Sequence, residues 1–411
     1  MLRWRRVDLF SWLSIAAATT VVLTAALLRG RFYAIFATVL LSIHTAVSSA
    51  LWPHVGWSWP VFAYLQVATY VHFLTLVRSS LRPLAYRALV SVPASAFWAG
   101  SFLAVPWAIA VAFGAEPLGL FVPYALAGVG LVQSLRHAEE QVDLALDGRT
   151  VASLARYPLG ESRCERPLRL VQMSDPHLGP FMSERRLREL CERAVAYQPD
   201  LVLLTGDFVT MESHNAGPAL ARALEPLKAL EGRVFACRGN HDHEAPDMIA
   251  GALAAAKVRL LNDEAVVVET EAGPVQIVGL DFHFRERKRR IEEACRRLPR
   301  EAGAFRLVLL HDPGAFRHVP DGDADLVLSG HTHGGQLGLV SLGLPHTFVS
   351  AFTSIPDHGH WALGKNRLYV HRGTAHYGFP LRIGVPAEHS LLRVHPVASR
   401  STRLVPPPVG L

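Results

Sequence analysis

One stretch of the chain decides how the rest is interpreted: Leu326-Val327-Leu328-Ser329-Gly330-His331-Thr332-His333-Gly334-Gly335-Gln336. Its first residues are apolar, as in a short buried strand, and its glycines predict a sharp turn that comes close to a bound group. Alternate side chains of an extended or turning backbone point to opposite sides. His331 and His333 are therefore better placed to reach two different ions, or two sides of one cleft, than to hold one ion together. A pair of surface histidines would look the same, so the rest of the chain has to supply partners.

Polar side chains follow four other apolar strand candidates. These side chains are Asp175 and His177 after residues 168–173, Asp207 after 201–204, Asn240 and His241 after 234–237, and His311 after 307–310. Open α/β sheets bind ligands at this carboxyl edge of their strands. The donors are oxygen and nitrogen without sulfur, which suits Mn, Fe or Zn. They are too many for one ion and too few for two separate shells, so we expect a carboxylate shared by two ions.

The composition excludes some classes of protein. The chain has 411 residues, of which 50% are hydrophobic, and a mean hydropathy of +0.22; this is too apolar for an ordinary soluble protein and long enough for two to three domains. The net charge of +6 comes mainly from arginine. Nucleic acid is not an expected partner, because no basic stripe interleaved with aromatic residues is present. The four cysteines are widely spaced and form no CxxC motif, so we expect free buried thiols rather than a disulfide framework.

Residues 1–136 are expected to be a transmembrane region of about five helices. Five apolar runs have the length that spans a bilayer; they are residues 9–28, 32–52, 61–77, 88–113 and 118–135. Trp52, Trp57, Trp59 and Tyr64 lie near run ends, as interfacial aromatic residues do. His44 and His72 lie inside the runs and are either functional or packing residues.

Arginines near the run ends predict the orientation. The ends on one side carry Arg3, Arg5 and Arg6; those on the other side carry Arg29, Arg31, Arg78, Arg82, Arg87 and Arg136. The positive-inside rule places the second set, and with it the C-terminal domain, on the cytoplasmic side. We therefore expect a protein integral to the inner cell membrane with a cytoplasmic catalytic domain.

After the apolar runs the sequence becomes more polar and then alternates between strand and helix candidates. Residues 137–165 are expected to be a polar connector, residues 166–397 an α/β domain, and residues 398–411 a C-terminal tail. Strand candidates alternate with helical stretches in the α/β domain; besides the five above they are residues 265–268, 275–280 and 368–370. The clearest helix is residues 184–197, with Ser183 as its expected N-cap.

The motifs in their order resemble those of the calcineurin-like metallophosphoesterases. That order is Asp-x-His at Asp175, Gly-Asp at Asp207, Gly-Asn-His-Asp at Asn240, His311, and Gly-His-x-His at His331. The resemblance covers roughly residues 168–395. The sequence around Arg372-Gly373, Arg382 and Glu388 resembles the sequences of a membrane-associated bacterial branch of the family, the YkuE and YaeI type. The multi-span N-terminal region resembles that of vertebrate transmembrane proteins with such a domain.

The resemblance implies a four-layer αββα sandwich, preceded here by an all-α transmembrane region, and a centre of two divalent ions. Asp175, His177 and His333 would hold the first ion. Asn240, His311 and His331 would hold the second, and Asp207 would bridge both. His241 would act on the substrate, either as the general acid for the leaving oxygen or by stabilising charge in the transition state.

One position departs from the family pattern. In the phosphoprotein phosphatase branch, a second aspartate after the Gly-Asp motif orients the catalytic histidine. This chain reads Gly206-Asp207-Phe208-Val209-Thr210, so His241 needs another partner or works without one. A phosphoprotein substrate is less expected as a result.

Two further segments have alternative interpretations. The basic run Arg285-Glu-Arg-Lys-Arg-Arg290 is either a solvated face or a contact for anionic lipid head groups. Phe348, Phe352 and Trp361 form either an apolar lip for a lipid substrate or part of the core.

These features together predict a membrane-anchored phosphoesterase with two metal ions. A metal-bridging hydroxide would attack phosphorus in line, in a phosphodiester or pyrophosphate bond of a lipid-linked substrate. The expected partners are the phosphoester and the bilayer. The alternative is a membrane sensor or transporter with a regulatory phosphoesterase domain. The sequence predicts neither the oligomeric state nor which metal is native.

Overall fold

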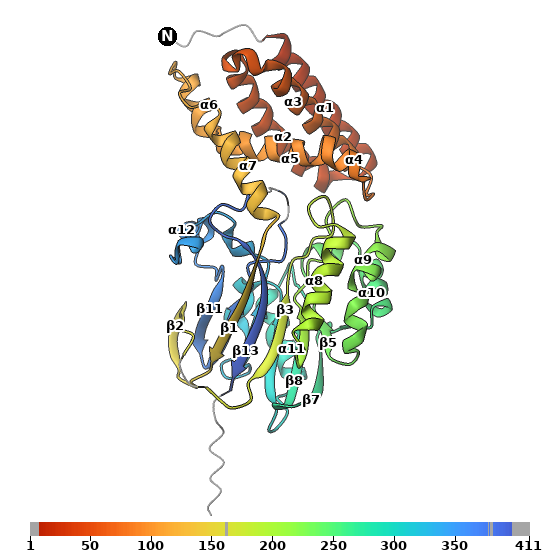
Figure 1. Ribbon diagram of the computed structural model, residues 1–411, viewed down its shortest axis with the longest axis vertical. Helices are drawn as coiled ribbons and strands as arrows, with labels where there is room; N and C mark the ends of the chain where they lie inside the picture. Colours follow the sequence, from red (N-terminus) through yellow and green to blue (C-terminus); the bar gives the residue numbers. More distant parts are fainter. Residues whose placement is uncertain (1–7, 161–162, 377, 379–380, 397–411) are drawn as a thin grey trace, which may run out of the picture.

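The computed structural model describes residues 8–160, 163–376, 378 and 381–396. It has an N-terminal bundle of helices and a C-terminal α/β part, which lie end to end (Figure 1). The predicted tail, residues 398–411, and Arg3, Arg5 and Arg6 lie outside the described residues.

The bundle consists of helices that correspond to the five apolar runs. They are α1 (Leu9–Leu28), α2 (Arg31–Leu51), α3 (Trp59–Thr75), α4 (Leu84–Tyr86), α5 (Val92–Leu103), α6 (Val105–Ala112) and α7 (Val122–Ser134). Two described segments, Leu9–Leu28 and Arg31–His54, are long and apolar enough to cross a membrane. A third candidate is the pair Leu84–Leu103 and Val105–Ala112, which bends by 52° at a short break. The expectation of about five spans stays a prediction.

The α/β part contains two sheets. The first has the strand order β1-β13-β3-β4-β5-β6 and the second β2-β11-β12-β10-β9-β8-β7. The strands of the first sheet are β1 (His137–Ala145), β3 (Leu168–Met173), β4 (Leu201–Leu204), β5 (Val234–Ala236), β6 (Arg259–Leu260) and β13 (Ala387–His395). Those of the second are β2 (Val151–Arg156), β7 (Glu264–Thr270), β8 (Gly273–Leu280), β9 (Phe305–Leu310), β10 (Leu326–Ser329), β11 (Gly359–Gly364) and β12 (Asn366–Val370).

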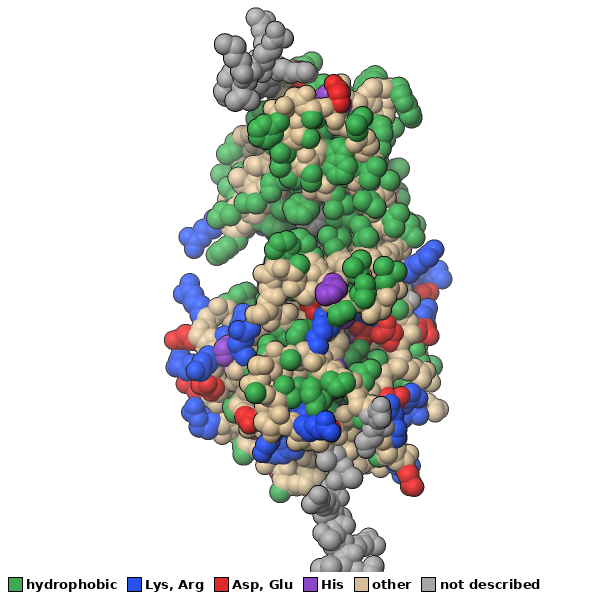
Figure 2. Space-filling model, turned by 90° about the vertical axis from the view of Figure 1, so that its left-hand side faces the viewer, with side chains coloured by type: hydrophobic (Ala, Val, Ile, Leu, Met, Phe, Trp, Pro, Cys, Tyr) green, Lys and Arg blue, Asp and Glu red, His purple; other side chains and the backbone are tan. Residues whose placement is uncertain are grey.

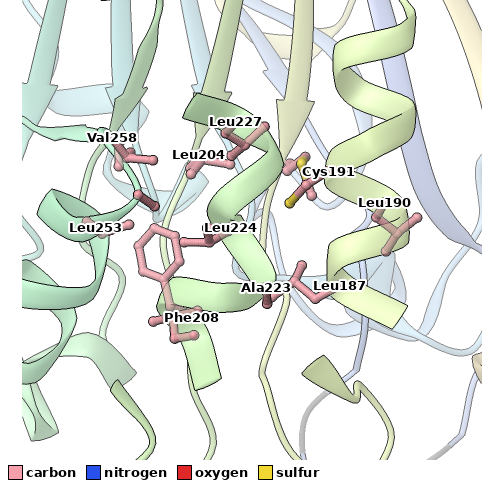
Figure 3. Packing of buried hydrophobic residues seen from close by; sticks show 14 of the residues in the cluster. Leu187, Leu190, Cys191, Leu204, Phe208, Ala223, Leu224, Leu227, Leu253 and Val258 are labelled. Carbon is pink, nitrogen blue, oxygen red and sulfur yellow. The ribbon is translucent and has the colours of Figure 1, made fainter. Parts of the chain in front are cut away.

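Three apolar cores join four layers, as expected. Leucines of both sheets, including Leu170, Leu203, Leu309 and Leu328, form the core between the sheets. The outer face of the first sheet packs on helices α8 (Glu184–Ala196), α9 (Gly217–Leu224) and α10 (Pro246–Ala255) (Figure 3). The outer face of the second sheet packs on α11 (Arg287–Arg297). Strands buried on both faces have to be apolar throughout, which is why their sequences are continuous hydrophobic runs.

Helix α8 follows its sequence signals closely. Leu187, Leu190, Cys191 and Ala194 are buried along one face, at the spacing of an amphipathic helix. The hydroxyl of Ser183 accepts a hydrogen bond from the Arg186 backbone N–H at 3.2 Å. The predicted N-cap is therefore confirmed.

The segment expected to be a polar connector instead supplies the edge strand of each sheet. Strand β1 pairs in parallel with β13, from His137 opposite Ala387 to Ala145 opposite His395. Strand β2 pairs in antiparallel fashion with β11. The connector prediction was wrong for this reason: edge strands expose polar side chains, and both partners lie more than two hundred residues further along the chain. The α/β part begins directly after α7.

The bundle and the α/β part contact one another through several side chains. The Arg186 guanidinium donates to the Leu135 carbonyl at 2.6 Å, and that of Arg87 to the Pro180 carbonyl at 3.0 Å. Glu212 is buried on the same side, with its Oε1 atom 3.8 Å from Nδ1 of His72 on α3. The loops after β3 and β4 therefore lie against the end of the bundle.

Candidate metal centre

The predicted site residues meet where five strands end. Strands β3, β4 and β5 run parallel in one sheet, and β9 and β10 run parallel in the other. Their C-terminal ends therefore share an edge, and the loops beyond them carry all eight residues proposed from the sequence. Five of these residues have left-handed backbone, with φ of 53° at Asp175, 43° at His177, 57° at Asp207, 70° at His331 and 51° at His333. Non-glycine residues rarely adopt this conformation, and such strain collects at functional sites.

Asp175, His177 and His333 form the first group of donors. The Nε2 atom of His333 lies 3.5 Å from Oδ1 of Asp175, and Nε2 of His177 lies 3.9 Å from the same oxygen. The two imidazole rings stack with their centroids 5.2 Å apart. One ligand atom of each residue lies within 4.8 Å of the others, so the three could hold one metal ion.

Asp207, His311 and His331 form the second group. The Oδ2 atom of Asp207 lies 3.2 Å from Nε2 of His311, and Nδ1 of His331 lies 3.2 Å from that same nitrogen. These three residues could also hold one ion. The Oδ2 atom of Asp207 is in addition 3.8 Å from Nε2 of His177 in the first group. One carboxylate oxygen thus lies between both groups, and His331 and His333 reach different groups.

Two glycines allow the loops to approach this closely. A Cβ atom on Gly330 would lie 2.3 Å from Oδ2 of Asp175, and one on Gly239 would lie 2.1 Å from Oδ1 of Asp207. Both distances are far below van der Waals contact. Any side chain at either position would push an aspartate out of the site.

Backbone carbonyls hold three of the histidines in one orientation. The Nδ1 atoms of His177, His311 and His333 face the carbonyl oxygens of Val209, Thr205 and Ala375 at 3.2, 2.6 and 3.1 Å. A proton on Nδ1 completes each of these hydrogen bonds and leaves Nε2 as the atom with a lone pair. Metal-binding histidines are typically oriented in this way.

Asn240 and Asp242 occupy different roles in the loop after β5. The Oδ1 atom of Asn240 is buried and, among the described residues, accepts no hydrogen bond. Asp242 accepts hydrogen bonds from the backbone N–H groups of Asp207, Phe208 and Gly239, each at 2.8 Å. Asp242 therefore ties this loop to the one that carries Asp207, and its oxygens face the backbone.

His241 has a carboxylate partner that sequence reasoning missed. Its backbone N–H donates to Oδ1 of Asp207 at 2.9 Å, and its ring lies 5.7 Å from the ring of His177. Its Nδ1 atom lies 3.1 Å from Oε1 of Glu244, whose other oxygen lies 3.6 Å from Nε2 of His214. Both His241 and Glu244 lie on the single-turn helix His241–Glu244. The i, i+3 spacing of histidine and glutamate in Gly-Asn-His-Asp-His-Glu is the signal for this pair, whereas the family pattern has its carboxylate after Gly-Asp.

Burial and mutual attraction set the charges of the groups. Burial lowers the pKa of His177 to about 3 and that of His331 to about 4, so both rings are neutral. Burial also acts to lower the pKa of His311, but the Asp207 carboxylate outweighs it and raises that pKa to about 10. Burial acts to raise the pKa of Asp207, and the attraction of His311 instead brings it well below its ordinary value. Burial raises the pKa of Asp175 to about 6.

These residues fit divalent metal ions. Neutral imidazoles, carboxylates and an amide oxygen are ligands that Mn, Fe and Zn accept. The buried Oδ1 of Asn240 lacks a hydrogen-bond donor in the described part of the chain, and a cation beside it would supply the missing partner. His311 and His331 face each other nitrogen to nitrogen across 3.2 Å, where only a proton or a cation relieves the repulsion of two lone pairs.

Comparison with known proteins gives consistent matches. Residues 168–335 match the calcineurin-like phosphoesterase family. The phosphodiesterase YaeI of Escherichia coli K12 is 30% identical over 234 residues, which are 56% of this chain and 82% of that protein. The Bacillus subtilis metallophosphoesterase YkuE is 27% identical, over 52% of this chain and 74% of that protein.

A vertebrate protein is also similar to the chain. The transmembrane protein with metallophosphoesterase domain of Danio rerio is 28% identical over 54% of this chain. The match spans about half of that protein's length, 52%.

Proposed function

Because the chain belongs to the calcineurin-like phosphoesterase family of metal-dependent phosphoester hydrolases, we propose that it is a membrane-anchored phosphodiesterase or pyrophosphatase that acts on a lipid-linked substrate. The observation that carries the hydrolase part is the meeting of two donor groups at Oδ2 of Asp207. Two adjacent cations suit a phosphoryl group, because they neutralise its oxygens and lower the pKa of attacking water.

We assign three donor residues to each metal ion, and a fourth donor, Asp207, to both ions. Asp175, His177 and His333 would hold one ion, and Asn240, His311 and His331 the other. Asp207 would contribute to both. His177 and His331 are neutral and can bind a cation directly, whereas His311, whose pKa Asp207 raises to about 10, would release its proton when the ion binds.

We assign the role of general acid to His241. Glu244 accepts a hydrogen bond from Nδ1 of His241, so we assign the acid–base role to the other ring nitrogen, Nε2. The pKa of His241 is raised: burial lowers it, but the hydrogen bond to Glu244 and the nearby carboxylates more than compensate. These contacts favour the protonated form of the ring. His241 would donate this proton to the leaving oxygen, so that the leaving group departs as an alcohol and not as a costly alkoxide.

The position of the site supports a substrate that comes from a membrane. The loops that carry Asp175 and Asp207 continue into the segments that contact the bundle. Asn215 donates to the Ser79 carbonyl at 3.3 Å, and Met211 packs against a small apolar cluster of the bundle that includes Val77. A head group at the surface of the bilayer would thus be close to the metal centre. A free nucleotide would gain nothing from this location.

The arginines support an inner-membrane protein with a cytoplasmic catalytic domain. The Arg29 guanidinium, after α1, donates to the carbonyls of Leu76 after α3 and of Met211 in the α/β part. Arg31 begins α2, Arg78 and Arg82 follow α3, and Arg136 directly precedes β1. The positive-inside rule applies to arginines in this location.

The test uses the purified full-length chain in nanodiscs with added Mn²⁺. Hydrolysis is compared for a diester or pyrophosphate whose head group is attached to a lipid and for the same head group on a water-soluble chain. We expect faster turnover of the lipid form and none with Asp207→Ala. Equal or faster turnover of the soluble form would remove the lipid-linked part of the proposal, and metal-independent turnover would remove the two-metal part.

A further inference from the structure

The segment after the histidine pair presents an apolar surface, here called the apolar rim. It consists of the exposed side chains Leu339, Leu342, Leu344, Phe348 and Phe352. Leu342 is 73% exposed and Phe352 is 74% exposed. Residues 337–356 contain no Asp, Glu, Lys or Arg. So many large apolar side chains on one charge-free segment mark a surface that meets another apolar phase.

The rim is a structured element. Its two arms pair where the Leu339 N–H donates to the His346 carbonyl at 2.8 Å. Thr347 and Ser350 form a capping box at the start of α12 (Phe348–Phe352). The rings of Phe348 and Phe352 lie 4.9 Å apart. The apolar side chains are thus held outward by backbone hydrogen bonds.

The rim adjoins the helical bundle. Leu337, at its start, packs with Leu381 against Ala99 and Ala127 of helices α5 and α7. The side-chain oxygen of Gln133 on α7 accepts from the Gly384 N–H at 2.9 Å, and Gly384 in turn accepts from the Ser341 N–H. In Figure 1, α12 lies on the edge of the α/β part nearest the bundle. Figure 2, which shows this face, has apolar side chains on both sides of the junction and many charged side chains further down.

We propose that the apolar rim is a second membrane contact, inserted in the interfacial layer of the same bilayer that holds the bundle. The inference rests on the membrane anchoring in the proposed function. Three observations favour lipid as the occupant: the rim is continuous with the apolar surface of the bundle, it lacks charge, and it lies beside the arginine-bearing helix ends. Aromatic and leucine side chains on an uncharged segment insert into the interfacial layer of a bilayer, at the boundary between head groups and acyl chains.

The contact would bring the metal centre to the lipid surface. His333 begins the turn that leads into the rim, and a Cβ atom on Gly335 would lie only 2.7 Å from Oγ1 of Thr347 at the base of α12. The rim would therefore form one wall of the route by which a lipid head group reaches the metal centre.

The depth of the rim is measurable in the full-length chain. Leu342 or Phe352 is replaced by cysteine for labelling. The background carries Cys164→Ser, so that the three remaining native thiols, which are buried, do not react with the label. Each cysteine carries an NBD fluorophore, and the chain is placed in nanodiscs of phosphatidylcholine and phosphatidylglycerol. Quenching is measured with shallow nitroxide lipids and with aqueous iodide. Leu13 on α1, 62% exposed, marks the anchor, and Val267 on β7, 44% exposed at the opposite end, marks water.

Emission of the rim probes is expected to fall by roughly half with the shallow nitroxide lipids, because interfacial side chains reside at the same level of the bilayer as the nitroxide group. Aqueous iodide is expected to leave the emission of the rim probes unchanged. If iodide reaches the rim probes as it reaches Val267 while the Leu13 probe responds to lipid, the rim lies in water and the inference is overturned with the anchor intact. If no probe responds to lipid, the anchoring and the inference both fail. If neither quencher reaches the rim, protein covers it and the inference is also overturned.

A second readout concerns activity. The double variant Leu342→Glu/Phe352→Glu is expected to lose about tenfold in turnover of a lipid-presented substrate, because carboxylates are repelled by anionic lipid and replace the apolar side chains that would insert. Turnover of the soluble form and the melting temperature should stay unchanged. Val267→Glu is the matched control and should behave as the unmodified chain in both assays. Equal turnover of the lipid form by both variants would contradict a role of the rim in substrate access.

Discussion

Replacement of Glu244 by glutamine tests how the chain compensates for the missing aspartate. Glu244→Gln keeps the size of the side chain and an acceptor oxygen 3.1 Å from Nδ1 of His241, but it removes the negative charge. A hydrogen bond to a charged group contributes about 1.5–3 kcal/mol and a neutral one about 1 kcal/mol. The side chain of Glu244 is 41% exposed, so solvent screening reduces the difference to about 1 kcal/mol.

This energy predicts a shift of the pH profile with a definite sign. Glu244 stabilises the protonated ring, so its neutralisation lowers the pKa of His241 by about 0.7 unit, at 1.36 kcal/mol for each unit. If His241 donates a proton, the alkaline limb of kcat/KM moves to lower pH by that amount. Above the limb the variant should be about fivefold slower, whereas below it the rates should agree.

The assay measures kcat/KM for hydrolysis of a phosphodiester as a function of pH, on both sides of the alkaline limb, with saturating Mn²⁺. Glu292→Gln is the matched control, because Glu292 has the same 41% exposure and pairs with Lys288 on α11. A control profile identical to that of the unmodified chain is expected. An unshifted alkaline limb in Glu244→Gln, or a uniform loss at every pH, would refute the role of Glu244 in holding the proton on His241.

Three other predictions follow from the site and the core. Mn²⁺ must displace the proton that His311 keeps up to about pH 10, so its affinity should rise about tenfold per pH unit from pH 7 to 9; calorimetry in buffers of different ionisation enthalpy should show one proton released, and a flat affinity would contradict this. His331→Ala and His333→Ala should each retain about one of two bound ions by elemental analysis, since the rings belong to different groups; loss of both ions in either variant would contradict separate sites. Phe208→Ala should destabilise the α/β part by about 3–5 kcal/mol in denaturant, because this ring is fully buried, while Phe284→Ala, at an exposed ring, should stay within about 0.5 kcal/mol.

The sequence predicted the site more completely than the sheets around it. Short apolar runs followed by Asp, Asn or His place their polar ends at one edge whenever the strands are parallel, so the motifs alone bring Asp175, Asp207 and His311 together. Strands β1 and β13 have no such signal. They pair with each other across the whole α/β part, and pairings of high sequence separation leave no local pattern.

Glu244 illustrates a different limit. The family pattern predicts a carboxylate shortly after Gly-Asp, whereas in this chain the carboxylate lies three residues beyond His241 on a single helical turn. Asp242 lies in the same turn and holds the Asp207 loop by accepting hydrogen bonds from its backbone N–H groups. A local spacing became meaningful only when the tertiary contact was known.

The count of metal ions against activity tests the central claim most directly. The full-length chain, stripped with chelator, is titrated with Mn²⁺ while bound metal and phosphodiester hydrolysis are measured in the same samples. We predict that activity rises until two ions are bound per chain, and that Asp207→Ala, which removes the oxygen between the two groups, binds fewer ions and does not hydrolyse the substrate. Full activity with one ion or none, or undiminished activity of Asp207→Ala, would contradict a two-metal phosphoesterase.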